Sequence, residues 1–137
     1  MMSKLEKMAR DSMAAWNAHD VDKIVSLEAD DAVNEVVPTG EVYHGRTEYG
    51  DYLRNTFAAF PDFKVDLKSV IASGERAVLE WVITGTFKGV LQPLGLQPTG
   101  KSFTVRGTTV TEAQGGRFKH STDYWDSATM FKQIGIT

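Results

Sequence analysis

The N-terminal part of the chain places apolar side chains every three or four positions, the spacing of a helix with one buried face. Ser3-Lys4-Leu5-Glu6 has the capping-box pattern, and the apolar positions behind it predict a first helix that ends at Asn17. Asp20 is expected to cap a second helix over 21–29. A third helix is predicted over 46–60, where a proline ends it.

From Phe63 onward the alternation changes to every second position, the period of β-strands. A short hairpin is predicted in the N-terminal half, with strands over 32–37 and 41–44. Further strands are predicted over 63–72, 77–88, 102–113 and 117–125, and a terminal helix over 127–134. Gly115-Gly116 is expected to form the last hairpin turn. Helices followed by long antiparallel strands predict one α+β domain over 1–137, with about three N-terminal helices packed against a curved sheet that encloses a pocket.

Composition narrows the possible chemistry. The chain has 137 residues, no cysteine, a formal net charge of −3 and 42% hydrophobic residues. Without thiols it has neither disulfides nor zinc–thiolate sites, and its interspersed charges provide no basic face for nucleic acid. No apolar run is long enough to span a membrane, and no pair of histidines has metal-ligand spacing. We therefore expect a cytoplasmic protein that binds a small apolar molecule without a metal ion.

Asp123 is the first catalytic candidate, because it precedes Tyr124 and Trp125 near the end of the last predicted strand. Burial among aromatic side chains destabilises the charged carboxylate and raises its pKa, which makes the group usable as an acid or base near neutral pH. His120 is expected on the opposite strand face because side chains alternate along a strand. Asp126 is expected to cap the terminal helix.

Large aromatic residues on several predicted elements suit a cavity for a flat apolar ligand. The candidates for its wall are Trp16, Phe57, Trp81 and Trp125, with Asn34 as a polar group in the same pocket. The alternative for each aromatic is that it only fills the core, which is the common fate of a buried aromatic side chain.

Three segments, Ala15-Trp16-Asn17-Ala18-His19-Asp20, Tyr43-His44-Gly45-Arg46 and Asp123-Tyr124-Trp125-Asp126, resemble motifs of the SnoaL-like polyketide cyclases. That family belongs to the cone-shaped superfamily of nuclear transport factor two and ketosteroid isomerase. The resemblance implies a cone-shaped sheet and a cofactor-independent intramolecular aldol closure of an apolar, carbonyl-rich substrate. Asp123 matches the family's general acid/base. The resemblance also implies a homodimer formed through the outer face of the sheet.

The neighbour of Asp123 on the preceding strand depends on the strand register. Cyclases of this type often carry a His or other polar partner there, and this chain has no His in that region. A simple two-residue glycine turn places Thr108 opposite Asp123 and Arg106 on the same face, where its charge would lower the pKa of Asp123. A bulge would bring Gly107 and Thr109 to that face instead. Both registers are open, with Arg106 and Thr108 as candidate pocket residues.

Two other functions are open as well. A non-catalytic binder of a hydrophobic small molecule would use the same pocket. Isomerase or epoxide hydrolase chemistry would need an altered residue set, because Trp81 and Ile83 stand about where epoxide hydrolases of the limonene type carry an Arg and a second Asp. Val36 stands near the position of the isomerase base.

Overall fold

The computed structural model describes residues 2–136. Within this range the chain forms four helices, α1 (Lys4–Asn17), α2 (Val21–Ser26), α3 (Gly45–Ala59) and α4 (Ser127–Gln133). The Ser3 Oγ accepts a hydrogen bond of 3.0 Å from the backbone N–H of Glu6, and the carboxylates of Asp20 and Asp126 cap α2 and α4 in the same way. These caps pair N–H groups that have no partner inside the helix. The predicted capping roles of Asp20 and Asp126 are confirmed.

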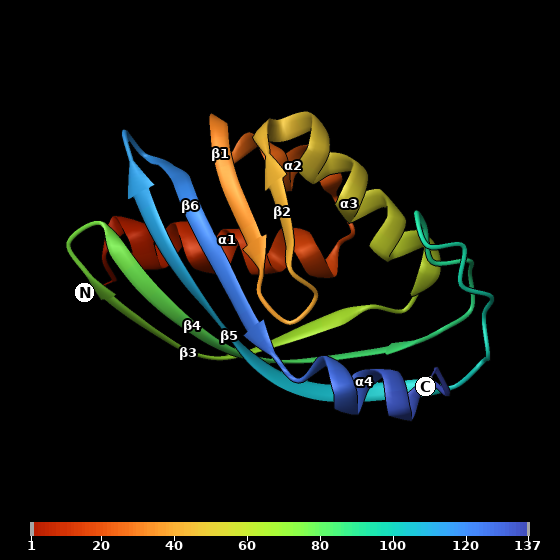
Figure 1. The fold of residues 1–137 in the computed structure, drawn as a ribbon. Helices are drawn as coiled ribbons and strands as arrows, with labels where there is room; N and C mark the ends of the chain where they lie inside the picture. The colour runs from red at the N-terminus through yellow and green to blue at the C-terminus, as the bar shows by residue number, and fades with distance from the viewer. Residues whose placement is uncertain (1, 137) are drawn as a thin grey trace.

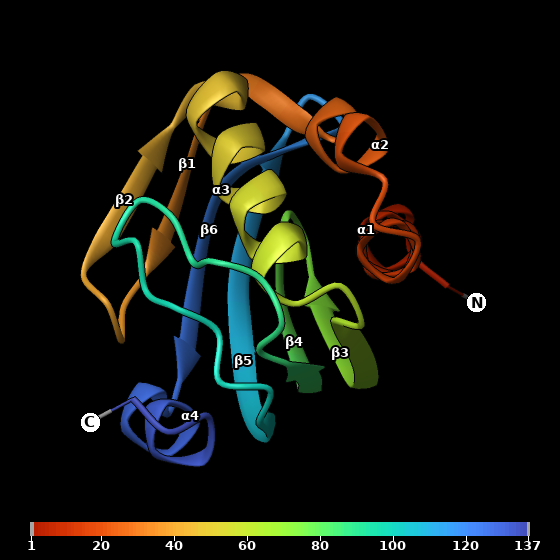
Figure 2. The same cartoon turned by 90° about the vertical axis from the view of Figure 1, so that its right-hand side faces the viewer.

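The strands form one curved sheet in the order β2-β1-β6-β5-β4-β3. They are β1 (Glu28–Val36), β2 (Glu41–His44), β3 (Lys64–Ser73), β4 (Arg76–Thr86), β5 (Ser102–Gln114) and β6 (Arg117–Trp125). β1 and β6 run parallel, and the other neighbouring pairs are antiparallel. In Figures 1 and 2 the sheet curls around α1 and α3, which lie on its concave side. The predicted α+β class with a curved sheet is confirmed.

The core fills the space between the sheet and these helices. Its largest fully buried side chains are Phe87, Phe103, Ile24, Leu53 and Ile134. Phe60 at the end of α3 contacts both Phe87 and Phe103, with ring centroids 5.5 and 5.2 Å away. Within residues 2–136, no helix combines the length and the apolar character that a membrane span requires.

The second helix is shorter than the helical pattern predicts. α2 stops at Ser26 and β1 begins at Glu28, although helical spacing continues to residue 29. The backbone N–H of Phe118 in β6 donates to the Leu27 carbonyl at 2.9 Å, and Glu28 is the strand partner of Phe118. Pairing with a strand distant in sequence therefore draws these residues into the sheet, and it turns Glu28 toward the interior.

A bulge near the β5–β6 turn decides which side chains share a face with Asp123. Lys119 of β6 is left without an opposing residue on β5, so the register shifts by one position. Thr109 then lies opposite Asp123. The alternative register, with Thr108 opposite Asp123 and Arg106 on the same face, is wrong.

Candidate active site

A cavity of about 790 Å³ lies inside the curve of the sheet. Its wall is formed by α1 and α3, by the concave side of the sheet, by the 91–94 loop and by α4. Aromatic side chains line it on several sides, among them Trp16, Phe60, Phe63, Trp81, Trp125 and Phe131. This volume and lining suit an organic molecule with more than one ring.

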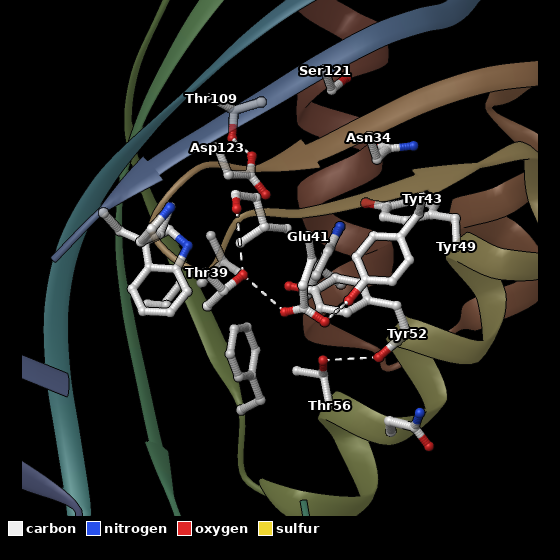
Figure 3. Close-up of a pocket in the computed structure, with 18 of the residues that line it drawn as sticks. Asn34, Thr39, Glu41, Tyr43, Tyr49, Tyr52, Thr56, Thr109, Ser121 and Asp123 are labelled. Atoms are coloured by element: carbon white, nitrogen blue, oxygen red, sulfur yellow. Dashed lines mark hydrogen bonds between the residues drawn. The ribbon is translucent and has the colours of Figure 1, made fainter. Parts of the chain in front are cut away.

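Asp123 lies beside Thr109 on one side of this cavity (Figure 3), and a short hydrogen-bond chain ends at its carboxylate. The indole Nε1–H of Trp81 donates to Thr109 Oγ1 at 2.9 Å, and the Thr109 hydroxyl donates to Asp123 Oδ1 at 2.6 Å. An indole N–H can only donate, so the one hydroxyl proton of Thr109 is directed to the carboxylate. Oδ1 is thereby occupied, and Oδ2 is the oxygen available to a ligand.

The surroundings of Asp123 make it a weak acid. Burial raises its pKa to about 6, against the lowering effect of the Thr109 hydrogen bond. The direction agrees with that expected from its aromatic neighbours. Arg106 is exposed on the other face of β5, and so it does not hold Asp123 in the ionised form. A carboxyl group with such a pKa can both take up and release a proton near neutral pH.

Gly107 makes room for the first member of the hydrogen-bond chain. Trp81 of β4 lies directly opposite Gly107 of β5 in the sheet. A Cβ atom at position 107 would collide with the Trp81 ring and lie 2.7 Å from the carbonyl oxygen of Tyr124. Glycine therefore lets the indole lie against β5, where its Nε1 reaches Thr109 two residues further along the strand.

Glu28 contributes a second carboxyl group to the lining. The residue is 5% exposed, and its Oε1 accepts a hydrogen bond of 2.7 Å from Asn34 Nδ2. Its pKa is raised to about 7, chiefly by burial and also by the charge of Asp123, while the Asn34 hydrogen bond and Arg46 act in the opposite direction. Sequence reasoning missed Glu28 because its position fits the second predicted helix. The buried alternation of Ala32, Asn34 and Val36 breaks at the exposed Asp30, so it does not lead back to Glu28.

Tyr43, Tyr49 and Tyr52 lie across the cavity from Asp123 in Figure 3. Burial raises the pKa of all three phenols, so they stay neutral and keep their protons at physiological pH. The Tyr43 hydroxyl donates to Glu41 Oε2 at 2.5 Å, and the Tyr43 and Tyr52 rings stack with centroids 4.5 Å apart. This side of the cavity therefore offers flat surfaces and neutral polar groups.

The structure brings most, but not all, of the sequence-predicted site residues together. Trp16, Asn34, Trp81 and Trp125 line the same cavity as Asp123. Phe57 does not line it, because it packs behind Trp16 and stacks on the His19 ring at 4.2 Å. Arg106 and Thr108 do not line it either, because the bulge in β6 leaves them on the outer face. The prediction that these three residues shape the pocket is corrected.

His120 lies on the outer face of β6, as strand alternation predicts. Its Nε2 is 2.8 Å from Glu35 Oε1, and both side chains are partly exposed. The pair is therefore a surface contact away from the cavity.

The cavity lining is acidic. It contains five carboxyl groups, those of Glu28, Glu41, Glu48, Asp51 and Asp123. Among the described residues that line it, none is Lys, Arg or His. Within residues 2–136 no three His, Cys, Asp or Glu side chains are grouped so that they could hold a metal ion.

The sequence matches the family model described as SnoaL-like polyketide cyclase over residues 6–134. It has no match among curated proteins.

Solved structures share the fold over nearly the full chain. A proposed SnoaL-like polyketide cyclase from Jannaschia sp. CCS1 has a TM-score of 0.87 at 16% identity, covering 98% of this chain and 93% of that one. IdmH, a proposed polyketide cyclase from Streptomyces antibioticus, has a TM-score of 0.80 at 22% identity, covering 98% and 100%. A Catenulispora acidiphila protein of ketosteroid isomerase-like fold, solved with trimethylamine, has a TM-score of 0.82 at 21% identity, covering 96% and 94%. At these identities the likeness establishes the fold.

Proposed function

The chain belongs to the SnoaL-like polyketide cyclase family, and on that premise we propose that it closes a ring in an apolar, carbonyl-rich substrate by intramolecular aldol addition, with Asp123 as general acid/base. Asp123 takes a proton from a carbon that lies between two carbonyl groups. The enolate then attacks another carbonyl carbon of the same molecule, and the resulting alkoxide gains a proton. Such a carbon is already acidic, so one well-placed carboxylate can start the reaction without a cofactor.

The hydrogen-bond chain from Trp81 through Thr109 to Asp123 is the observation that carries this proposal. The hydrogen bond from Thr109 holds Oδ1 and so restrains rotation of the Asp123 carboxylate. Oδ2 remains free to receive the substrate proton. A fixed carboxylate with a pKa of about 6 is well matched to proton transfer near neutral pH.

The shape of the cavity supports the ring-closing step. Its aromatic walls favour a folded apolar substrate, and holding the two reacting carbons close together removes much of the entropic barrier to forming the bond. The neutral phenols of Tyr49 and Tyr52, across from Asp123, are suited to hydrogen-bonding substrate carbonyl groups, whereas the Tyr43 hydroxyl donates to Glu41.

Asp123→Asn tests the proposal directly. The amide keeps an oxygen for the Thr109 hydrogen bond but cannot accept a proton, so we expect turnover to fall by about 10²–10⁴-fold. The test substrate is an aryl diketone that carries a further ketone at the neighbouring ring position. Its closure to the aldol changes the absorbance, and the rate of this change gives the turnover. Quenching of tryptophan fluorescence gives the affinity, which should change little. Asp66→Asn, at an exposed position of β3, is the matched control.

Undiminished turnover in Asp123→Asn would reject the assignment of Asp123. If the wild-type protein binds the diketone without converting it, the observation favours the second candidate function, a non-catalytic binder of hydrophobic small molecules.

A further inference from the structure

Building on the proposed function, we infer that Glu28 is a second proton-transfer residue, which donates its proton to the substrate oxygen while Asp123 takes the proton from carbon. The two carboxyl groups come from different strands, β1 and β6, and both line the same cavity. A site with two such groups can place an acid at one end of the substrate and a base at the other.

The hydrogen bonds of Glu28 fix which oxygen meets the substrate. Asn34 Nδ2 donates to Oε1 at 2.7 Å, so Oε1 acts as an acceptor. The proton of the neutral acid is therefore carried by Oε2. Asp123 has the same arrangement, because Thr109 occupies its Oδ1. In each carboxyl group one oxygen is held by the protein and the other remains for chemistry.

The groups around Glu28 favour its neutral form. Burial is the main cause, and the negative charge of Asp123 on β6 adds to it. On α3, Tyr49 is a buried phenol that stays neutral. Arg46, also on α3, is the cation that acts on Glu28, yet its guanidinium donates to the Glu28 backbone carbonyl at 3.0 and 2.6 Å and pairs with the Asp30 carboxylate at 3.2 Å. Arg46 therefore holds the start of β1 in place.

The negative charge of Asp123, which raises the pKa of Glu28, supports this division of roles. Asp123, with a pKa of about 6, loses its proton first and is mostly ionised at neutral pH. Glu28, with a pKa of about 7, still keeps its proton on a large fraction of molecules at that pH. One cavity thus holds a base and an acid at the same time.

The aldol step balances with these two groups. Asp123 Oδ2 takes the proton from carbon, and the electron pair of the broken C–H bond forms the new C–C bond to the second carbonyl carbon. As that C=O double bond becomes a single bond, its oxygen takes the proton from Glu28 Oε2. Asp123 is then protonated and Glu28 ionised, and transfer of one proton from Asp123 to Glu28 through water restores both groups.

Glu28→Gln separates this role from a structural one. Glutamine keeps an oxygen that can accept from Asn34 but has no proton to transfer, so we expect turnover of the aryl diketone to fall about 10²-fold. Wild-type turnover should rise as the pH passes about 6, where Asp123 ionises, and fall as it passes about 7, where Glu28 ionises. The variant should lose only the alkaline fall. Glu112→Gln, exposed on β5, is the matched control.

Asn34→Leu tests the same assignment while leaving Glu28 in place. It removes a hydrogen bond that lowers the pKa of Glu28, so the alkaline fall should move to higher pH. If neither variant alters the alkaline side of the profile, Glu28 does not supply the proton and the inference is overturned.

Ligand binding provides a readout that does not require turnover. The probe is β-tetralone, a neutral bicyclic ketone, and its affinity is followed by quenching of tryptophan fluorescence. Neutral Glu28 donates to the ketone oxygen, so wild-type affinity should weaken about two- to tenfold as the pH passes about 7, the worth of one hydrogen bond. The weakening should be absent in Glu28→Gln and present in Asp123→Asn. An identical pH dependence in wild type and Glu28→Gln would overturn the inference, even if no substrate is turned over and the proposed function fails.

Discussion

Thr109 has one hydroxyl proton, and Trp81 determines where that proton points. The indole N–H of Trp81 donates to the Thr109 oxygen. The Thr109 hydroxyl proton is therefore free to be donated to the carboxylate of Asp123. A residue that never has to touch the substrate can thus set both the orientation and the acidity of the group that does. We regard Thr109 as a positioning residue for Asp123.

Thr109→Val should shift the pH profile of turnover. Valine has nearly the same shape but no hydroxyl, and losing a hydrogen bond that lowers the pKa of Asp123 should raise that pKa above about 6. The acid side of the profile should then move to higher pH, and turnover below neutral pH should fall. Thr109→Ser should restore the wild-type profile, and Thr108→Val, on the outer face, is the control. An unchanged acid side would show that Thr109 does not act on Asp123.

The two buried carboxyl groups differ in how visible they are in the sequence. Asp123 can be found because it stands beside large aromatics in a strongly alternating strand, where one local pattern predicts both its burial and its raised pKa. Glu28 cannot be found in that way, because the residues around it also fit a helix. Its burial results from pairing with Phe118, which is far away along the chain.

At the scale of the elements, β5 and β6 show what local pattern can and cannot predict. The bounds of β6, Arg117–Trp125, agree with the predicted strand, and β5 extends one residue beyond the predicted end. The bulge at Lys119 is different, since the alternation of β6 gives no unambiguous sign of one unpaired residue. The choice between Thr108 and Thr109 as the neighbour of Asp123 therefore needed the observed pairing of the strands.

Gly107→Ala should disturb the packing between β4 and β5. The added methyl group has to displace the Trp81 ring or the strand beside it, and overpacking of this kind costs about 1–3 kcal/mol in the free energy of unfolding. Chemical denaturation would measure this loss. Turnover should fall as well, because a displaced indole no longer reaches Thr109.

A double-mutant cycle identifies the cause of this loss. In a Trp81→Leu background the smaller side chain leaves space for the methyl group, so Gly107→Ala should cost less than it does in the wild type. An equal cost in both backgrounds would show that the Trp81 ring is not the obstacle.

At the scale of the whole molecule, the outer face of the sheet carries exposed apolar side chains. Ile71 and Val78 pair across β3 and β4 and are 70% and 39% exposed, and Tyr124 on β6 is 47% exposed. We expect two copies of the chain to associate through this face, since covering it removes apolar surface from water. Val78→Asp should then weaken the dimer in sedimentation experiments at a series of concentrations. A wild-type protein that is monomeric throughout that series would contradict this expectation.

The absence of Lys, Arg and His from the described cavity lining also favours a neutral substrate over an anionic one. A molecule with a free carboxylate or a phosphate must give up its hydration shell to enter a space whose described lining offers no Lys, Arg or His to pair with it, whereas a neutral ester avoids that cost. We therefore expect a substrate whose acid group is esterified to enter the cavity more readily than the same molecule with a free acid.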